Sequence, residues 1–341
     1  MRHIIGYACT ALVLIAGLTA CQNARTASAP TASTVTGAEA AKGAELYGAG
    51  LFTTGAWDFF MAFTPDQTDV FFCRANDTFS TYDIFETRLG ADGHWTAPSK
   101  PGFAAQWSNA DPHVSPDGNT VFFISNRPPS GKPGEPAVPD TYDIWFAERE
   151  KGGTWGAAQR LPAPVNDIKA EKYSPSVARN GNLYFGTVRA GGRGASDLWI
   201  ARRVNGVYQT PENLGEAINT AGDEVEPWIA PDESYLIFSA LHRADSIGGY
   251  DLYVSRKVGG SWEKARLVTG GINTPAREFN QSVSPDGKWL YFSSDRRYTG
   301  PLGERFDTPR DERAVTGIGD GKRGDIYRIA ISELNIAGGS K

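Results

Sequence analysis

The stretch that decides the fold is EPWIAPDESYLIFSALHRADSIGGYDLYVSRKVGGSW, residues 226–262, and FNQSVSPDGKWLYFSSDRR, residues 279–297, repeats its first half. In both stretches a strand-like run ends in a Pro-Asp turn, and a strand rich in aromatic residues follows. In the first stretch a polar loop then leads to a further strand that begins with Asp251. A unit of this size that recurs along a chain is typical of repeat architectures.

Two anchors of this unit occur five times each. The turn residue is Asp66, Asp117, Asn180, Asp232 or Asp286, with spacings of 51, 63, 52 and 54 residues (117−66, 180−117, 232−180, 286−232). The second anchor is Asp83, Asp143, Asp197, Asp251 or Asp325, each followed by Ile or Leu. Because the two anchors alternate along the chain five times, the sequence predicts five copies of one structural unit.

Each copy contains four strand candidates, which in the fourth copy are residues 224–230, 234–240, 251–257 and 261–268. Four antiparallel strands in about 50 residues are typical of a propeller blade. The sequence therefore predicts an all-β fold, a single β-propeller domain over residues 44–341. The last copy lacks a fourth strand, and we expect residues 45–53 to supply it and close a ring of five blades. A sixth blade would have to lie in residues 295–324, which contain too little apolar sequence.

The turn SPDG (284–287), the strand LYFSS (290–294) and the segment GGYDLYVSRKVGGSW (248–262) resemble the WD40-like repeats of the TolB-type propeller superfamily. The phrases PENLGEAINTAGDE (211–224) and GGYDLY (248–253) are similar to propeller modules of bacterial envelope proteins that also carry a peptidoglycan-binding OmpA-like domain. The resemblance covers about residues 45–331 and implies the fold. We expect no direct peptidoglycan anchoring, because the sequence stops after the propeller.

The first 20 residues are predicted to be a signal peptide, with Arg2 and His3 ahead of the apolar run 4–18. Residues 18–21, LTAC, resemble a bacterial lipobox, which implies cleavage before Cys21 and lipid on that cysteine. The alternative is an ordinary secretory signal cut after Ala20. Gln22, where Asp would indicate inner-membrane retention, favours the outer membrane. Residues 21–43, rich in Ala, Thr and Ser, are predicted to be a flexible tether.

The formal net charge of −5 argues against a nucleic-acid partner. Cys73 is the cysteine left for the fold, so no disulfide is expected, and its strand context predicts burial. The sequence has no phosphate-binding Gly-rich loop, HExxH, CxxC or Gly-x-Ser-x-Gly motif, and only 4 histidines. We therefore expect no cofactor and no metal site.

Strand order predicts that the long loops share one end of the ring, the loop face, and that the Pro-Asp turns share the other end, the turn face. Function concentrates in loops carried by a rigid scaffold. The candidate binding residues on the loop face are Asp111, His113, Arg127, Arg189, Glu224, Glu226, Trp228, His242, Arg243, Glu278 and Arg296.

An arginine ends the second strand of every copy (Arg74, Arg127, Arg189, Arg243, Arg296), which predicts ion pairs with the carboxylates that begin the first strands. A residue that recurs in every blade is more often a structural element than a catalytic one. The same holds for the Asp of the second anchor, which we interpret as a loop-fixing residue. Residues that break the repeat are better functional candidates: His113, Glu226, Trp228, His242 and the insertion 297–321.

Two functions from different classes fit this sequence. The first is a lipid-anchored binding or scaffold module of the bacterial envelope, periplasmic or surface-facing, that docks a protein or glycan through its loop face. The alternative is a carbohydrate-active enzyme in which Asp111, Glu226 and Glu278 supply an acid and a base. Neighbouring arginines weaken the enzyme hypothesis because they would lower the pKa of a general acid. A purely structural assembly factor is the third possibility.

Overall fold

The computed structural model describes residues 43–139, 141–167, 170–300 and 317–336, which belong to one compact unit, residues 40–341. The predicted signal peptide, Cys21 and nearly all of the predicted tether lie outside the described residues. So does the middle of the insertion, residues 301–316.

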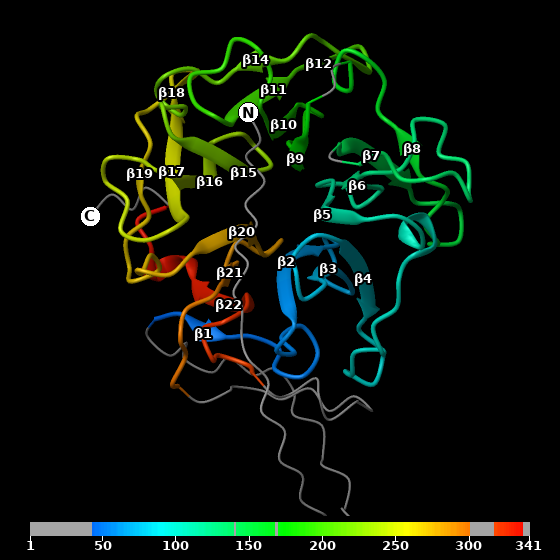
Figure 1. Ribbon diagram of the computed structural model, residues 1–341, viewed down its shortest axis with the longest axis horizontal. Coiled ribbons are helices and arrows are strands. Elements are labelled where there is room, and N and C mark those ends of the chain that lie inside the picture. Colours follow the sequence, from blue (N-terminus) through cyan, green and yellow to red (C-terminus); the bar gives the residue numbers. More distant parts are fainter. Residues whose placement is uncertain (1–42, 140, 168–169, 301–316, 337–341) are drawn as a thin grey trace, which may run out of the picture. The chain divides into compact units, whose positions relative to one another are not determined.

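Five antiparallel sheets surround a common centre, so the predicted five-bladed β-propeller is confirmed (Figure 1). The first blade contains β2 (Trp57–Phe63), β3 (Asp69–Ala75) and β4 (Tyr82–Arg88). The second contains β5 (Asn109–Val114), β6 (Thr120–Ser125), β7 (Asp143–Glu148) and β8 (Gln159–Arg160). The third contains β9 (Lys172–Val177), β10 (Leu183–Thr187), β11 (Asp197–Ala201) and β14 (Glu212–Asn213).

The fourth blade contains β15 (Asp223–Ile229), β16 (Tyr235–Leu241) and β17 (Asp251–Val258), and both β18 (Ser261–Trp262) and β19 (Arg266–Leu267) pair with β17. The fifth contains β20 (Glu278–Val283), β21 (Trp289–Ser294), β22 (Asp325–Ala330) and β1 (Glu45–Leu46). A separate hairpin, β12 (Arg203–Val204) with β13 (Val207–Tyr208), extends from the third blade.

The ring is closed by the strand that was predicted to close it. β1 pairs antiparallel with β22, with Glu45 opposite Arg328 and Leu46 opposite Tyr327. Arg328 Nε lies 2.6 Å from Glu45 Oε1, and Leu46 is 2% exposed. Pairing of the N-terminal strand with the last blade leaves no open sheet edge at the point of closure.

The innermost strands β2, β5, β9, β15 and β20 contact one another in a closed ring, in which β20 returns to β2. Each of them is interrupted by a bulge with one non-glycine residue at positive φ, between 43° and 56°. These residues are Phe60, Asp111, Ser174, Glu226 and Asn280. A bulge bends its strand and increases the twist. Because it recurs in all five blades, we attribute it to the architecture. The bulge also breaks the alternation of side chains that a regular strand would have.

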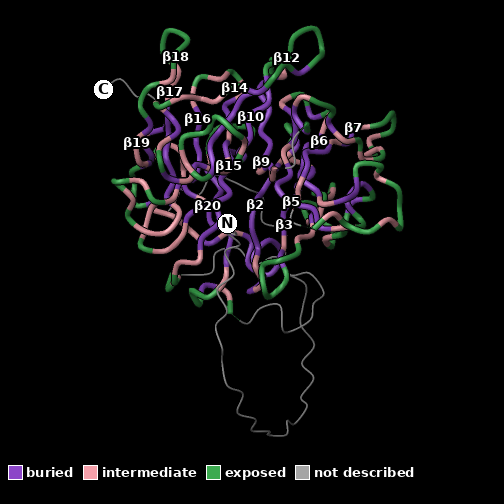
Figure 2. The backbone as a smooth tube through the Cα atoms, turned by 45° about the horizontal axis from the view of Figure 1, so that its top comes forward, coloured by how far each residue is buried: buried purple, intermediate pink, exposed green. Residues whose placement is uncertain are grey.

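The middle strands are buried on both sides because neighbouring blades cover them (Figure 2). All five residues of β10 are buried, and Phe71, Phe72 and Cys73 of β3 are 0% exposed. The predicted burial of Cys73 is therefore confirmed, and the structure records it as a free cysteine.

One blade departs from the four-strand prediction. In the first blade the outer position is held only by an isolated bridge, in which Glu86 and Ser99 exchange backbone hydrogen bonds of 2.8 and 3.0 Å. The helical residues in the described part are short 3-10 turns, such as Gly102–Ala104 and Ile331–Glu333. Within the described ranges, no helix has the length and apolar character needed to cross a membrane.

Candidate functional site

The arginine that ends each second strand is built into its blade. Arg243 Nη1 donates to Glu224 Oε1 at 3.0 Å and to the carbonyl of Ile218 at 2.9 Å. Its guanidinium group lies 4.4 Å from the ring centroid of Tyr253. Glu224 is 0% exposed and also accepts hydrogen bonds from the amide and hydroxyl of Thr220. Arg243 thus fixes an inter-blade loop and neutralises a buried carboxylate.

Two other blades repeat this ion pair, as the sequence predicts. Arg74 Nε lies 2.6 Å from Asp58 Oδ1, and an Nη atom of Arg296 lies 3.0 Å from Glu278 Oε1. Both carboxylates are 0% exposed and are capped by a threonine four residues upstream. Glu278 is therefore closed off from solvent.

The remaining two blades use different partners. Arg127 donates to Asn109 Oδ1 at 2.7 Å and to the carbonyl of Phe103 at 2.8 Å. Arg189 pairs with Asp167 at 2.6 Å, because its own first strand begins with Lys172 in place of an acid.

The Asp of the second anchor holds the loop that precedes the third strand. Asp251 Oδ2 accepts the backbone N–H groups of Ile247 at 2.7 Å and Gly248 at 3.2 Å. Asp197 accepts those of Arg193 and Gly194 at 2.5 and 3.0 Å. In these two blades the geometry matches the loop-fixing interpretation.

Two candidate carboxylates lie on the bulges of the innermost strands and reach the next blade. Asp111 Oδ2 accepts hydrogen bonds from the amide and hydroxyl of Ser174, both at 2.9 Å. Glu226 Oε2 accepts the amide of Asn280 at 2.7 Å and the hydroxyl of Ser239 at 2.7 Å. Burial raises the pKa of Asp111 to about 6 and that of Glu226 to about 7, and the charge of Asp111 contributes to the second shift.

His113 and Trp228 follow these bulges on the same strands. The backbone N–H of Val177 donates to His113 Nε2 at 3.0 Å, which ties the second blade to the third. Burial lowers the pKa of His113 to about 4. Trp228 is half-buried, with its ring 5.7 Å from that of Tyr235.

His242 is the candidate residue that stands open to solvent. Its side chain is 72% exposed, and Nδ1 lies 3.5 Å from Asp223 Oδ2. The structure thus divides the candidates into arginines and acids fixed within their blades, residues that bond to the next blade (Asp111, His113 and Glu226), the half-buried Trp228, and the exposed His242.

Sequence reasoning missed a group of half-buried tyrosines at the loop face: Tyr82, Tyr142, Tyr173 and Tyr250, which come from four blades. The rings of Tyr82 and Tyr142 lie 6.0 Å apart. Burial raises the pKa of Tyr82 and of Tyr250, and the negative charges of Asp111 and Glu226 respectively contribute. The signal was present in the sequence, because three of these tyrosines directly precede a second-anchor Asp.

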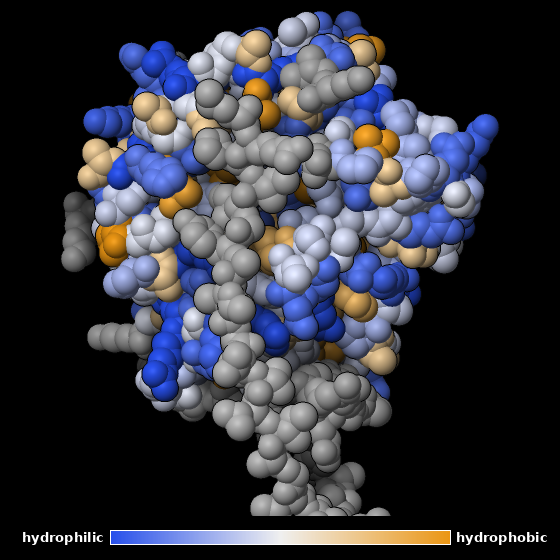
Figure 3. Space-filling view, viewed as in Figure 1, coloured by the Kyte–Doolittle hydropathy of each residue, from blue (hydrophilic) through white to orange (hydrophobic). Residues whose placement is uncertain are grey.

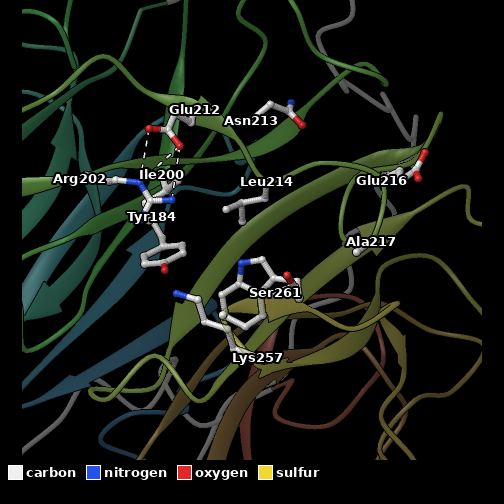
Figure 4. Close-up of a pocket in the computed structure, with 12 residues that line it drawn as sticks. Tyr184, Ile200, Arg202, Glu212, Asn213, Leu214, Glu216, Ala217, Lys257 and Ser261 are labelled. Carbon is white, nitrogen blue, oxygen red and sulfur yellow. Dashed lines mark hydrogen bonds and ion pairs between the residues drawn. The ribbon is translucent and has the colours of Figure 1, made fainter.

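Figure 3 shows the surface from the same side as Figure 1. Among the residues that are not drawn in grey, most of this surface is hydrophilic, and the hydrophobic residues are scattered over it. A separate pocket of about 340 Å³ lies between the third and fourth blades. Ile200, Leu214 and Trp262 line it together with Arg202 and Lys257, and Arg202 is drawn pairing with Glu212 (Figure 4). This pocket contains none of the predicted site residues.

Comparison with known protein families finds no match, and no curated protein sequence matches the chain. Among solved structures, the chain is similar to "putative TolB" from Agrobacterium tumefaciens, with 15% identity over 81% of this chain and 90% of that one and a TM-score of 0.46. It is similar to an alpha-L-arabinofuranosidase from Lactobacillus brevis, with 12% identity over 82% and 92% and a TM-score of 0.44. Because both identities lie below 25% and both TM-scores below 0.5, these similarities do not carry the fold assignment. The assignment of a five-bladed propeller rests on the strand pairing described above.

Proposed function

We propose that this protein is a binding module of the bacterial cell envelope that holds a glycan at the loop-face end of its propeller. In this proposal a lipid on Cys21 attaches it to the outer membrane, on the periplasmic or surface side. The observation that carries the proposal is the group of four half-buried tyrosines beside Asp111 and Glu226.

The chemistry of this group suits a sugar. Aromatic rings offer flat apolar surface with a polar hydroxyl at the edge, and binding sites combine such surface with a few fixed polar groups. Carboxyl oxygens accept hydrogen bonds from sugar hydroxyls. The backbone amides of Ser174 and Asn280 fix the orientation of both carboxyl groups, so little side-chain entropy is lost on binding.

Calorimetric titration with soluble fragments of envelope glycans tests this proposal. We expect Tyr250→Ala to weaken binding by about tenfold, since one aromatic contact contributes on the order of 1 kcal/mol. The matched control is Val258→Asp on the turn face, which should bind like the wild type. Absence of glycan binding, together with capture of a protein that Tyr250→Ala loses, would instead establish protein docking.

One observation keeps the enzyme alternative as a second candidate. A general acid needs a raised pKa near neutrality, and the pKa of Glu226 is raised to about 7. Glu278 is excluded as its partner because Arg296 and Thr274 occupy its carboxylate. A glycoside hydrolysis screen with wild type and Glu226→Gln tests this candidate: turnover by wild type that the variant loses would support it, and equal turnover would remove it.

A further inference from the structure

Two hairpins on adjacent blades carry exposed aliphatic tips. The blade-3 hairpin, residues 203–208, presents Val204 and Val207, which are 51% and 62% exposed. The blade-4 hairpin, residues 257–262, presents Val258, which is 59% exposed. The two hairpins extend from the same edge of the molecule, at β12 and β18 (Figure 2).

The equivalent turns of the first two blades show that aliphatic tips are not needed to build the turn. Between the bridged residues Leu89 and Trp95 stands Asp92, and between Arg149 and Trp155 stands Lys151. Both turns are polar at their tips. The valines of the third and fourth blades therefore break the repeat without a local structural reason.

Both hairpins lie on the turn face. The backbone N–H of Arg203 donates to Asn182 Oδ1 at 2.9 Å, and that of Lys257 donates to the carbonyl of Ser234 at 2.9 Å. Asn182 and Ser234 belong to the turns that join the first and second strands of these blades.

The polypeptide enters the propeller on this same face. The backbone N–H of Gly43 donates to Glu333 Oε2 at 2.7 Å. Glu333 follows Ile331, whose N–H donates to the carbonyl of Lys288 in the corresponding turn of the fifth blade at 2.8 Å. The described chain therefore begins on the hairpin side, at Gly43.

The composition around the valines suits a lipid surface. Residues 202–208 and 256–264 contain five cationic side chains and one carboxylate, and two of the cations pair with carboxylates outside these ranges, Arg202 with Glu212 and Lys257 with Glu233. Trp262 is half-buried and lines the pocket, with Lys257 Nζ 5.3 Å from its ring centroid. Trp, Lys and Arg beside aliphatic side chains form the combination that is enriched at membrane–water interfaces.

We propose that the edge of the turn face formed by the blade-3 and blade-4 hairpins docks on a lipid bilayer, with Val204, Val207 and Val258 in the interfacial layer and the turn of the second blade outside it. Three half-exposed valines bind a bilayer weakly on their own, but a tether of about 20 residues holds the domain within a few nanometres of it. The inference rests on the lipid anchor of the proposed function. Its consequence is an orientation in which the loop face with the four tyrosines points away from the membrane.

The test uses the full chain as the cell processes it, with Val258→Cys labelled by a polarity-sensitive dye. Lys151→Cys, at the equivalent turn of the second blade, is the matched control, and Cys73 is 0% exposed and stays unlabelled. The protein is placed on phosphatidylethanolamine–phosphatidylglycerol vesicles that contain a lipid-borne quencher. We expect a blue shift and roughly twofold quenching at position 258, and neither at position 151.

Equal, water-like emission at both positions would overturn the inference. Quenching at position 258 in whole envelopes but not on pure lipid vesicles would also overturn it, because a protein would then cover the hairpins. Mass spectrometry of the N-terminal peptide reads the anchor separately. If Cys21 carries no lipid, the lipid anchor of the proposed function is refuted. The emission at positions 258 and 151 is then compared in a Cys21→Ser background with excess vesicles, and this comparison tests the docking of the hairpins separately.

Discussion

Glu226 and Asn280 occupy the same position in neighbouring blades, and Glu226 Oε2 accepts the backbone N–H of Asn280 at 2.7 Å. Both residues have positive φ, 56° and 51°. The side chain of one bulge thus satisfies the amide of the next bulge. Asp111 and Ser174 repeat this arrangement between the second and third blades. The same carboxylates that we propose for ligand binding also connect the blades.

Glu226→Gln should make the protein less sensitive to rising pH. Burial raises the folded-state pKa of Glu226 from 4.5 to about 7, so the folded state binds more protons across that window. The free energy of unfolding therefore falls as pH rises from about 4.5 to 7, and glutamine removes this loss. At pH 8 we expect the variant to be more stable by about 1–3 kcal/mol in urea denaturation. Equal stability of wild type and variant at pH 8 would contradict this assignment.

His113 should act in the opposite direction. Burial lowers its folded-state pKa from 6.5 to about 4, so its contribution to stability is present above pH 6.5 and is lost as pH falls toward 4. His113→Gln keeps an acceptor for the Val177 amide without the titration, and should lose less stability between pH 7 and 5 than wild type. His113→Ala leaves that amide without its partner and should cost about 1–3 kcal/mol at pH 7. Identical acid sensitivity in wild type and His113→Gln would rule out this role.

Removal of the Arg243 side chain should be severe. It leaves Glu224, which is 0% exposed, as an uncompensated buried charge, at a cost of about 3–5 kcal/mol. The double variant Arg243→Ala with Glu224→Gln should recover part of this loss. Arg202→Ala is the matched control, because its pair with Glu212 is exposed and should contribute at most about 1 kcal/mol. Chemical denaturation measures all three, and a small effect of Arg243→Ala would disprove the structural role.

Closure of the ring predicts a strong dependence on Leu46. This side chain is 2% exposed in a strand of two residues, and Leu46→Ala should destabilise the propeller by about 2–5 kcal/mol. Leu89→Ala, at a residue that is 36% exposed, should change stability by less than about 0.5 kcal/mol. Comparable melting temperatures for the two variants would mean that the N-terminal strand does not close the ring.

The Cys73 thiol should be unreactive in the native protein. Burial raises its pKa well above the ordinary value, so the thiolate that reacts with alkylating agents is scarce. Iodoacetamide should modify Cys73 only after denaturation, as read by peptide mass spectrometry. Rapid modification under native conditions would show that the first blade opens readily.

Much of the fold could be predicted because the same turn and strand pattern recurs in every copy of the repeat. The turns at Asp117, Asp232 and Asp286 and the anchor at Asp251 recur in step, and an N-terminal strand was needed to complete the last blade. The weaker first blade was less predictable, since its outer strand is reduced to a bridge at Ser99. Short edge strands depend on neighbouring chain segments more than on their own residues.

The candidate site was predicted only in part. Residue spacing identified the arginines and the acids that begin the first strands. It could not show that Arg189 forms its ion pair with Asp167, or that Glu278 is closed off from solvent. Spacing also treats a strand as regular, whereas the bulges at Asp111 and Glu226 redirect both side chains toward the next blade. The tyrosines were missed because each one is ordinary within its own repeat.

The sequence by itself determined the five-fold repeat, the closing strand and the burial of Cys73, because these follow from periodicity and local turn chemistry. The tertiary structure alone decided which charges are neutralised, which backbone amides donate to a carboxylate of the preceding blade, and which four tyrosines share one end of the ring. The physical reason is that these contacts join residues that are distant in the sequence, 19 positions apart for Arg243 and Glu224 and 54 for Glu226 and Asn280. They form only when strands assemble into blades and the blades close around a common axis.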